Sequence, residues 1–333
     1  MLVMHGHPSE AADHSHDGLP PGHRHPHGRP GQGEDPTAPP SVGIVGAGRV
    51  GLALARALTA ADWPVVAVAS RDPARREAFR AVIPDARAFA EPAGVLDEAS
   101  LIFLTVPDDA IAAVAADLRL YSGQALVHTS GLLASTILEP AMAAGTEKAS
   151  FHPLVAFADP DAAVEALHGA TIAIEGDDPL VRLLAELAEA IGAQPVRLPV
   201  EGKAAYHAAA VLAAGGFVAL LDAIAELGRG AGLDEAGALA IYAPLVRQSL
   251  ANAERFGIAV ALTGPIVRGD IGTLRAHLLA MSDLAPGAID LYVAAARREI
   301  ALASGRGSLA SVSASEMVDL LDRWGAAGPV EAA

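Results

Sequence analysis

The clearest chemical signal in the sequence is a glycine-rich segment that follows an apolar run and opens an amphipathic one. It reads Gly46-Ala47-Gly48-Arg49-Val50-Gly51. In a strand-to-helix turn, glycines at these three positions permit a tight turn, a close approach of backbone to pyrophosphate, and close packing of helix on sheet. The start of the helix adds N–H groups and a positive dipole end. The pattern predicts a dinucleotide-binding site; the alternative is a glycine-rich turn that binds no ligand.

The residues that would distinguish NAD from NADP follow the next apolar run. An NAD site places an acidic residue roughly 20 residues beyond the fingerprint, where it binds the ribose hydroxyls. Here that position holds Ser70 and Arg71, and the first carboxylate is Asp72. A hydroxyl and a guanidinium suit a 2′-phosphate, so the sequence predicts NADP. Alternatively, the neighbouring Arg75 and Arg76 only coat a helix.

A second cofactor-binding segment is expected where a later apolar run ends at Thr105. In doubly wound sheets the ligand crevice lies at the carboxyl ends of the strands, where the strand order reverses. We therefore assign the ribose on the nicotinamide side of the cofactor to the residues that follow, Val106, Pro107 and Asp108.

Lysine occurs only at Lys148 and Lys203, although lysine and arginine together number 23. Lys203 and His207 are four residues apart, so a helix presents them on one face. An ammonium group can protonate a carbonyl oxygen as hydride arrives, and a neutral histidine can orient that lysine or hydrogen-bond the substrate. Lys203 and His207 are the candidate catalytic residues. The alternative is a solvated lysine and a core histidine; Lys148, beside Glu147, is expected at the surface.

Two further residues are candidates for binding a substrate. His152 is expected just past the end of a strand, where it could face the cleft or serve as a structural loop residue. Arg268 lies in a loop framed by glycine and proline, and arginine is the natural bidentate partner of a carboxylate. The alternative for Arg268 is pairing with Asp270.

These residues require a particular scaffold. From Ser41 to about Pro199, short apolar runs alternate with Ala-rich segments, which indicates a parallel sheet with crossover helices. Strands are expected at 42–46, 64–69, 100–105, 125–128, 148–151, 170–175 and 194–198, with helices such as 50–61 and 109–118 between them. The later pattern is helical. The predicted fold class is α/β, a Rossmann doubly wound, mainly parallel sheet followed by an all-α second domain.

The domain boundaries follow from the same pattern. The apolar stretch 208–221 has 14 residues, fewer than the roughly 20 needed to span a bilayer, so we interpret it as a buried core helix. The expected division is a disordered His/Pro/Gly-rich tail at 1–40, a Rossmann domain at 41–199, a helical substrate and dimerisation domain at 200–327, and a disordered end at 328–333.

Several of these segments together resemble bacterial Rossmann-like NADP-binding proteins with a helical C-terminal domain of uncharacterised function. The segments are His128-Thr129-Ser130-Gly131, His152-Pro153-Leu154, Gly202-Lys203-Ala204-Ala205-Tyr206-His207, Thr263-Gly264-Pro265 and Arg268-Gly269-Asp270. The resemblance covers residues 41 to about 327. More distantly, the chain is similar to the superfamily of 6-phosphogluconate dehydrogenase, β-hydroxyacid dehydrogenase and ketopantoate reductase.

In that superfamily the interdomain helix begins with a catalytic lysine followed four residues later by asparagine. These positions fall on Lys203 and His207, so the histidine departs from the pattern. The resemblance also implies that the turn of Ser130 and Gly131 donates to a substrate carboxylate, and that the helical domain forms a homodimer.

The chain is therefore predicted to be an NADP-dependent oxidoreductase that transfers hydride to a small 2-keto or related hydroxy acid, with ketopantoate as the nearest specific candidate. Alternatives are an imine reductase of the pyrroline-carboxylate type or a deazaflavin-linked NADP oxidoreductase. A further alternative, from a non-enzyme class of function, is an NADP sensor without catalytic activity.

The amino-acid composition limits the binding partners that the protein can have. The net charge of −16 disfavours nucleic acid and anionic membranes, and the lack of cysteine excludes disulfides and thiolate sites. No secretory signal is recognisable, so a cytoplasmic location is expected. No metal is expected in the folded part. Paired histidines in the tail could bind a divalent metal weakly or be merely solvated: His5, His7, His14, His16, His23, His25 and His27.

Overall fold

The computed structural model describes residues 39–157 and 160–325. The chain divides into two units, Met1–Ala204 and Ala205–Ala333, and each is described here by itself. The histidine-rich tail predicted at 1–40 lies outside the described residues, apart from its last two, and the end at 328–333 lies outside them as well.

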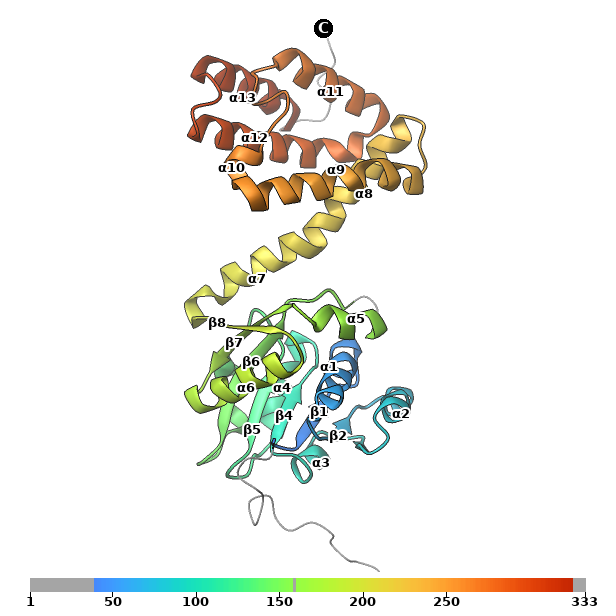
Figure 1. Cartoon of the computed structure of the whole chain (residues 1–333), viewed down its shortest axis with the longest axis vertical. Helices are drawn as coiled ribbons and strands as arrows, with labels where there is room; N and C mark the ends of the chain where they lie inside the picture. Colours follow the sequence, from blue (N-terminus) through green and yellow to red (C-terminus); the bar gives the residue numbers. More distant parts are fainter. Residues whose placement is uncertain (1–38, 158–159, 326–333) are drawn as a thin grey trace, which may run out of the picture. The chain divides into compact units, whose positions relative to one another are not determined.

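The first unit is built on one eight-stranded sheet with the order β3-β2-β1-β4-β5-β6-β7-β8 (Figure 1). Neighbouring strands are parallel except β6 and β7, which are antiparallel. This confirms the predicted doubly wound, mainly parallel sheet. The strands are β1 (Val42–Val45), β2 (Val65–Ala69), β3 (Arg87–Phe89), β4 (Leu101–Leu104), β5 (Ala125–His128), β6 (Glu147–Pro153), β7 (Thr171–Gly176) and β8 (Gln194–Arg197).

Helices cover both faces of this sheet. They are α1 (Arg49–Ala60), α2 (Pro73–Val82), α3 (Ala93–Leu96), α4 (Asp108–Asp117), η1 (Ser135–Ala141), α5 (Pro160–Leu167), α6 (Asp178–Ala190) and η2 (Val200–Gly202). Side chains of a strand alternate between the faces. In β4, Phe103 therefore packs with α1 and α6 in one core cluster, and Ile102 packs with α4 in the other. Burial on both faces explains why the central strands are continuous apolar runs.

The described part of the second unit is helical. Its elements are α7 (Lys203–Val211, which begins in the first unit), η3 (Leu212–Gly216), α8 (Phe217–Gly230), α9 (Glu235–Phe256), α10 (Ile258–Ala261), α11 (Ile271–Leu284), η4 (Pro286–Ala288), α12 (Ile289–Gly305) and α13 (Ser311–Gly325). A core of apolar side chains joins α11, α12 and α13, with Leu274, Ile300 and Leu321 among its buried residues.

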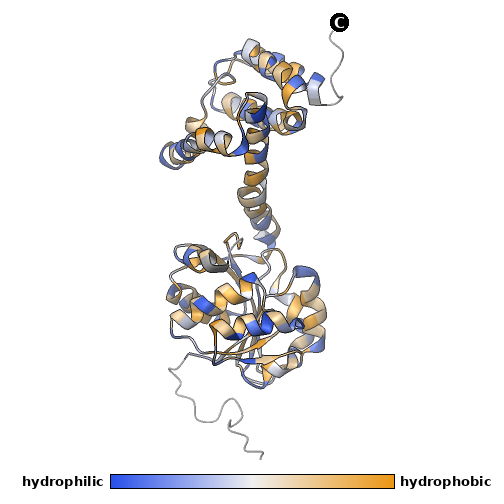
Figure 2. Cartoon of the chain, turned by 90° about the vertical axis from the view of Figure 1, so that its right-hand side faces the viewer, coloured by the Kyte–Doolittle hydropathy of each residue, from blue (hydrophilic) through white to orange (hydrophobic). Residues whose placement is uncertain are grey.

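One helix differs from its prediction. It runs without a break from Val200 to Gly230, and only 6% of its most apolar window is buried, so the predicted core helix at 208–221 is wrong. Leu212 is 71% exposed and Val218 63%. Figure 2 shows apolar residues along much of its length. His207 and Asp222 lie within the helix and do not end it, so by length and composition alone this one described helix could cross a membrane.

Candidate active site

The glycine-rich segment forms the turn between β1 and α1. Gly46 has φ +114°, and a Cβ there would lie 2.6 Å from the carbonyl oxygen of Thr105, so a side chain is excluded. The hydroxyl of Thr105 donates to the carbonyl oxygens of Gly46 (2.6 Å) and Val45 (3.3 Å), which ties the end of β4 to the turn. Helix α1 has no acidic residue in its first turn. Its positive end is therefore available for an anion.

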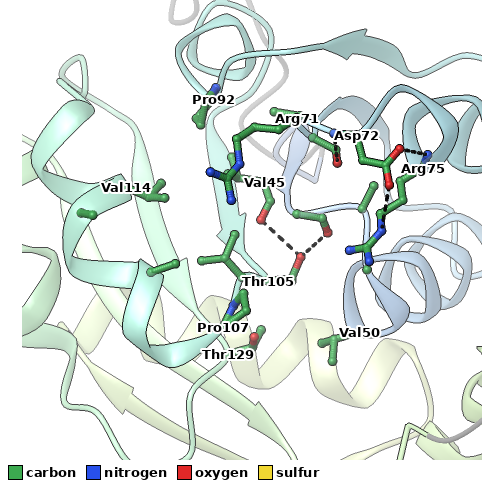
Figure 3. Close-up of a pocket in the computed structure, with 18 of the residues that line it drawn as sticks. Val45, Val50, Arg71, Asp72, Arg75, Pro92, Thr105, Pro107, Val114 and Thr129 are labelled. Carbon is green, nitrogen blue, oxygen red and sulfur yellow. Dashed lines mark hydrogen bonds and ion pairs between the residues drawn. The ribbon is translucent and has the colours of Figure 1, made fainter.

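A cavity of about 980 Å³ lies at this edge of the sheet (Figure 3). Its walls come from the carboxyl ends of β1, β2 and β4 and from the starts of α1 and α4. Of the predicted cofactor-binding residues, Gly51 lies beneath the turn and does not line the cavity. The others line it: Gly46, Ala47, Gly48, Arg49, Val50, Ser70, Arg71, Val106, Pro107 and Asp108. A Cβ on Gly48 would meet nothing within 4 Å, so the cavity reaches the backbone at this point.

The end of β2 presents positive charge to the cavity. The Asp72 carboxylate is turned to the start of α2, where it accepts from the backbone N–H of Ala74 (2.9 Å) and pairs with Arg75 (3.4 Å). Figure 3 shows Arg71 pointing into the cavity. Asp72 is engaged with α2, and Arg71 offers its guanidinium to a ligand in the cavity. A guanidinium suits a phosphate.

At the other end of the cavity, Ser130 holds a carboxylate. Its hydroxyl donates to Asp108 Oδ2 (2.6 Å) and accepts from the backbone N–H groups of Leu132 (3.2 Å) and Leu133 (3.0 Å). Ser130 is only 3% exposed, and Gly131 beside it is buried. The Ser130 hydroxyl thus binds Asp108, which lines the cavity, while donation from the turn of Ser130 and Gly131 to a substrate carboxylate stays a prediction.

His128 ends β5 and is fully buried. Its Nδ1 accepts from the backbone N–H of Ser130 (3.2 Å), which leaves Nε2 to carry the proton toward the carbonyl oxygen of Ala134 (3.3 Å). Burial lowers the pKa of His128 to about 4, and the positive charge of Lys203 acts in the same direction. His128 is therefore neutral at pH 7 and fixes the turn that contains Ser130.

Lys203 enters a buried polar cluster in the first unit. Its Nζ donates to Ser150 Oγ (2.7 Å) and lies 3.7 Å from Glu175 Oε2. Glu175 accepts from the backbone N–H (2.8 Å) and the hydroxyl (2.7 Å) of Ser135. Burial lowers the pKa of Lys203, and the negative charge of Glu175 opposes that change. The ammonium group is therefore paired inside the protein.

The remaining candidates lie in different places. His152 is inside β6, not just past its end, and shares a face of the sheet with Ser150 because side chains alternate along a strand. His207 lies on α7 in the second unit. Arg268 is exposed and lies between α10 and α11 of the same unit. Their predicted roles stay predictions. Within residues 39–157 and 160–325, no group of three or more histidine and acidic side chains is arranged to hold a metal ion.

The buried cluster also contains residues that are not among the candidates predicted from the sequence. Glu175 is the sole charged residue in the strand sequence of β7, TIAIEG. Acidic side chains are seldom fully buried without a partner, so this carboxylate was a recognisable signal for one. Ser135 and Ser150 gave no comparable signal, because an isolated serine in an apolar run has many ordinary explanations.

The comparisons with known proteins agree with this architecture. Residues 29–153 match the Rossmann-like domain family, and residues 170–299 match a domain of unknown function, DUF2520. The two matched segments lie one after the other along the chain. No curated protein matches the sequence.

Three solved structures share most of the fold. Protein TM1727 from Thermotoga maritima is 27% identical, with a TM-score of 0.61 over 80% of this chain and 99% of that one. BF3122 from Bacteroides fragilis, provisionally assigned as an NADP oxidoreductase, is 21% identical, with a TM-score of 0.64 over 80% and 97%. The 1-pyrroline-5-carboxylate reductase of Streptococcus pyogenes is 17% identical, with a TM-score of 0.56 over 80% and 98%.

Proposed function

We propose that the protein is an NADP-dependent oxidoreductase. The observation that carries this proposal is the cavity with the glycine turn on its wall and Arg71 pointing into it, while the neighbouring carboxylate of Asp72 is engaged with α2. A pyrophosphate fits the start of α1, and a 2′-phosphate fits Arg71. The NADP oxidoreductase assignment of BF3122, which has a similar fold, supports the same cofactor.

The first candidate reaction is reduction of a 2-keto acid to a 2-hydroxy acid, with ketopantoate as the nearest specific substrate. NADPH, when bound, supplies the hydride that adds to the carbonyl carbon. The oxygen must then receive a proton, and the Lys203 ammonium is the proton source we propose. A positive charge near that oxygen also stabilises the negative charge that develops on it.

A second candidate is reduction of an imine to an amine, and Asp108 favours it. This carboxylate lines the cavity and is oriented by Ser130. A negative charge stabilises a protonated imine, whereas it repels the carboxylate of a keto acid. The fold shared with 1-pyrroline-5-carboxylate reductase is compatible with such a substrate.

Oxidation of NADPH tests the proposal, measured with a panel of 2-keto acids and a panel of cyclic imines. If an imine is the substrate, Asp108→Asn lowers kcat/KM by about 10-fold to 100-fold, the effect of a charged hydrogen bond. If a keto acid is the substrate, the same variant does not lower kcat/KM for the acid at saturating NADPH; saturation is needed because Asp108 is also a predicted cofactor-binding residue. Asp117→Asn is the matched control, because Asp117 lines the cavity from the far end of α4.

The competing function is an NADP sensor without catalysis. Tight NADPH binding without turnover of any member of either panel would favour the sensor and overturn the enzyme proposal. Failure to bind NADPH would overturn both.

A further inference from the structure

We propose that Glu175 is a positioning residue for the reaction proposed above: it holds the Lys203 ammonium in one place and in its charged form. The inference rests on the proposed function only for the role of Lys203 in catalysis. The arrangement of the two side chains is a property of the first unit by itself.

Glu175 is itself fixed from several sides. Both of its oxygens accept hydrogen bonds from Ser135, one from the backbone N–H (2.8 Å) and one from the hydroxyl (2.7 Å). The hydroxyl of Ser150 lies 3.4 Å from Oε2 on the paired strand. The carboxylate is only 7% exposed. The position of this carboxylate is therefore set by a backbone donor as well as by side-chain hydroxyls.

Lys203 depends on this carboxylate because it is almost completely removed from water. It is 3% exposed, and its hydrogen bond to Ser150 Oγ is to a neutral group. A buried ammonium without a negative partner releases its proton, because the charged form pays the cost of desolvation. The counter-charge that touches it is Glu175, at 3.7 Å.

Other ionisable groups near Lys203 do not replace Glu175. Asp108, from α4, favours the charged lysine, but more weakly than Glu175 does. The Ser130 hydroxyl binds Asp108, whose exposed side faces the cavity. His128, from β5, is neutral at pH 7 and adds no negative charge. The spacing of Lys203 and His207 predicts that His207 orients the lysine or hydrogen-bonds the substrate; in the structure, Ser150 and Glu175 contact the Nζ of Lys203.

The scarcity of lysine makes a direct test practical. The chain contains only Lys148 and Lys203, so full-length protein labelled with carbon-13 at lysine Cε gives two signals, and Lys148→Arg assigns them. We expect Glu175→Gln to lower the pKa of Lys203 by about one to three units, the effect of removing an adjacent opposite charge. Lys148, which pairs with Asp177, is the internal reference and should not change.

Two further variants control the measurement. Glu189→Gln removes an exposed carboxylate from α6 and should leave both lysine signals unchanged. Glu175→Asp keeps the charge, but its shorter side chain withdraws the carboxylate from Lys203. The pKa of Lys203 should therefore fall less in Glu175→Asp than in Glu175→Gln. If Glu175→Gln does not fold, Glu175→Asp takes its place, and this smaller lowering is the expected result.

The outcomes separate this inference from the proposed function. A folded Glu175→Gln protein with an unchanged Lys203 titration overturns the inference, and so does a wild-type Lys203 that is already neutral at pH 7. Neither result depends on turnover. Once a substrate is found, the alkaline limb of the kcat profile should move to lower pH in Glu175→Gln and not in Glu189→Gln. An unmoved limb together with a shifted Lys203 signal would show that Lys203 does not supply the proton.

Discussion

Arg71 is the residue on which the choice of cofactor depends. It points into the cavity, while Asp72 caps α2. We expect wild-type protein to bind NADPH more tightly than NADH, and Arg71→Asp to reduce that preference by roughly 1.5 to 3 kcal/mol, the value of a charged hydrogen bond. Dissociation constants for both cofactors measure this. Arg80→Asp, on α2 and outside the cavity, is the control. A wild-type preference for NADH would contradict the assignment.

His128 makes stability depend on pH. Its pKa is about 4 in the folded protein, against an ordinary value of 6.5, so the unfolded chain takes up a proton between these values while the folded protein does not. Stability from this residue is fully present above pH 6.5 and is lost as the pH falls through about 4. The loss amounts to roughly 3 kcal/mol.

Urea unfolding at several pH values between about 7 and 4 measures this dependence. His128→Asn should lose less stability than wild type over the range, and the exposed His168→Gln should behave like wild type. Parallel curves for wild type and His128→Asn would mean that His128 is protonated in the folded state.

The site could be predicted from the sequence only in part, for a physical reason. Lys203 was selected because its residue type is rare, and the glycine turn because its spacing is specific. Glu175 was not selected, because its partner Ser150 faces it across the antiparallel pair β6 and β7. A single sequence does not reveal that β6 and β7 pair antiparallel, so contacts between these two strands become visible only in the structure.

At the scale of elements, two glycines in the turn between β1 and α1 are expected to affect different properties, one cofactor binding and the other stability. Gly48 faces the cavity with open space at the position of a Cβ, whereas a Cβ on Gly51 would lie 2.2 Å from the carbonyl oxygen of Gly46. We expect Gly48→Ala to keep the melting temperature and to weaken NADPH binding by at least about tenfold, or about 1.4 kcal/mol. Gly51→Ala should lower stability by about 1 to 3 kcal/mol through overpacking.

Thermal melting and NADPH titration of the two alanine variants measure these effects, and each variant is the control for the other. Wild-type affinity in Gly48→Ala would show that no pyrophosphate approaches the turn. An unchanged melting temperature in Gly51→Ala would show that the turn can relax around an added methyl group.

Elements were predictable where burial inside this chain dictates the pattern. The central strands β1, β4 and β5 are fully buried, and their apolar runs located them correctly. The edge strand β3 was missed, because it has three residues and none of them is buried. The helix at 208–221 was assigned to the core incorrectly, since an apolar pattern shows that side chains need cover but not which molecule supplies it.

At the scale of the whole molecule, the helical unit exposes many large apolar side chains, and contiguous exposed apolar surface marks sites of interaction. Many of the exposed residues lie on the consecutive helices α7 to α10, and α9 contacts both α8 and α10. They include Val211, Leu212, Val218, Ile241, Leu245, Leu250, Phe256 and Ile258. We propose that a second copy of the chain covers them. Arg247 and Glu254 on α9 would be costly to bury in a bilayer, whereas two copies can leave such charges at the rim of their interface.

The dimer is tested by the mass of the protein in solution, measured by light scattering after size exclusion without detergent. Wild type should have twice the mass of one chain. Leu245→Glu, which replaces a side chain that is 59% exposed, should raise the dimer dissociation constant at least about 100-fold, or about 3 kcal/mol, because the interface would bury a carboxylate. Tyr121→Glu, at a 56% exposed site in the first unit, should leave the dimer intact.

The Leu245 variant should still bind NADPH, since the cavity residues all belong to the first unit. A monomeric wild type, or one that sediments with membranes and needs detergent for release, would contradict the proposed dimer, and the second result would assign the long apolar helix to a bilayer instead.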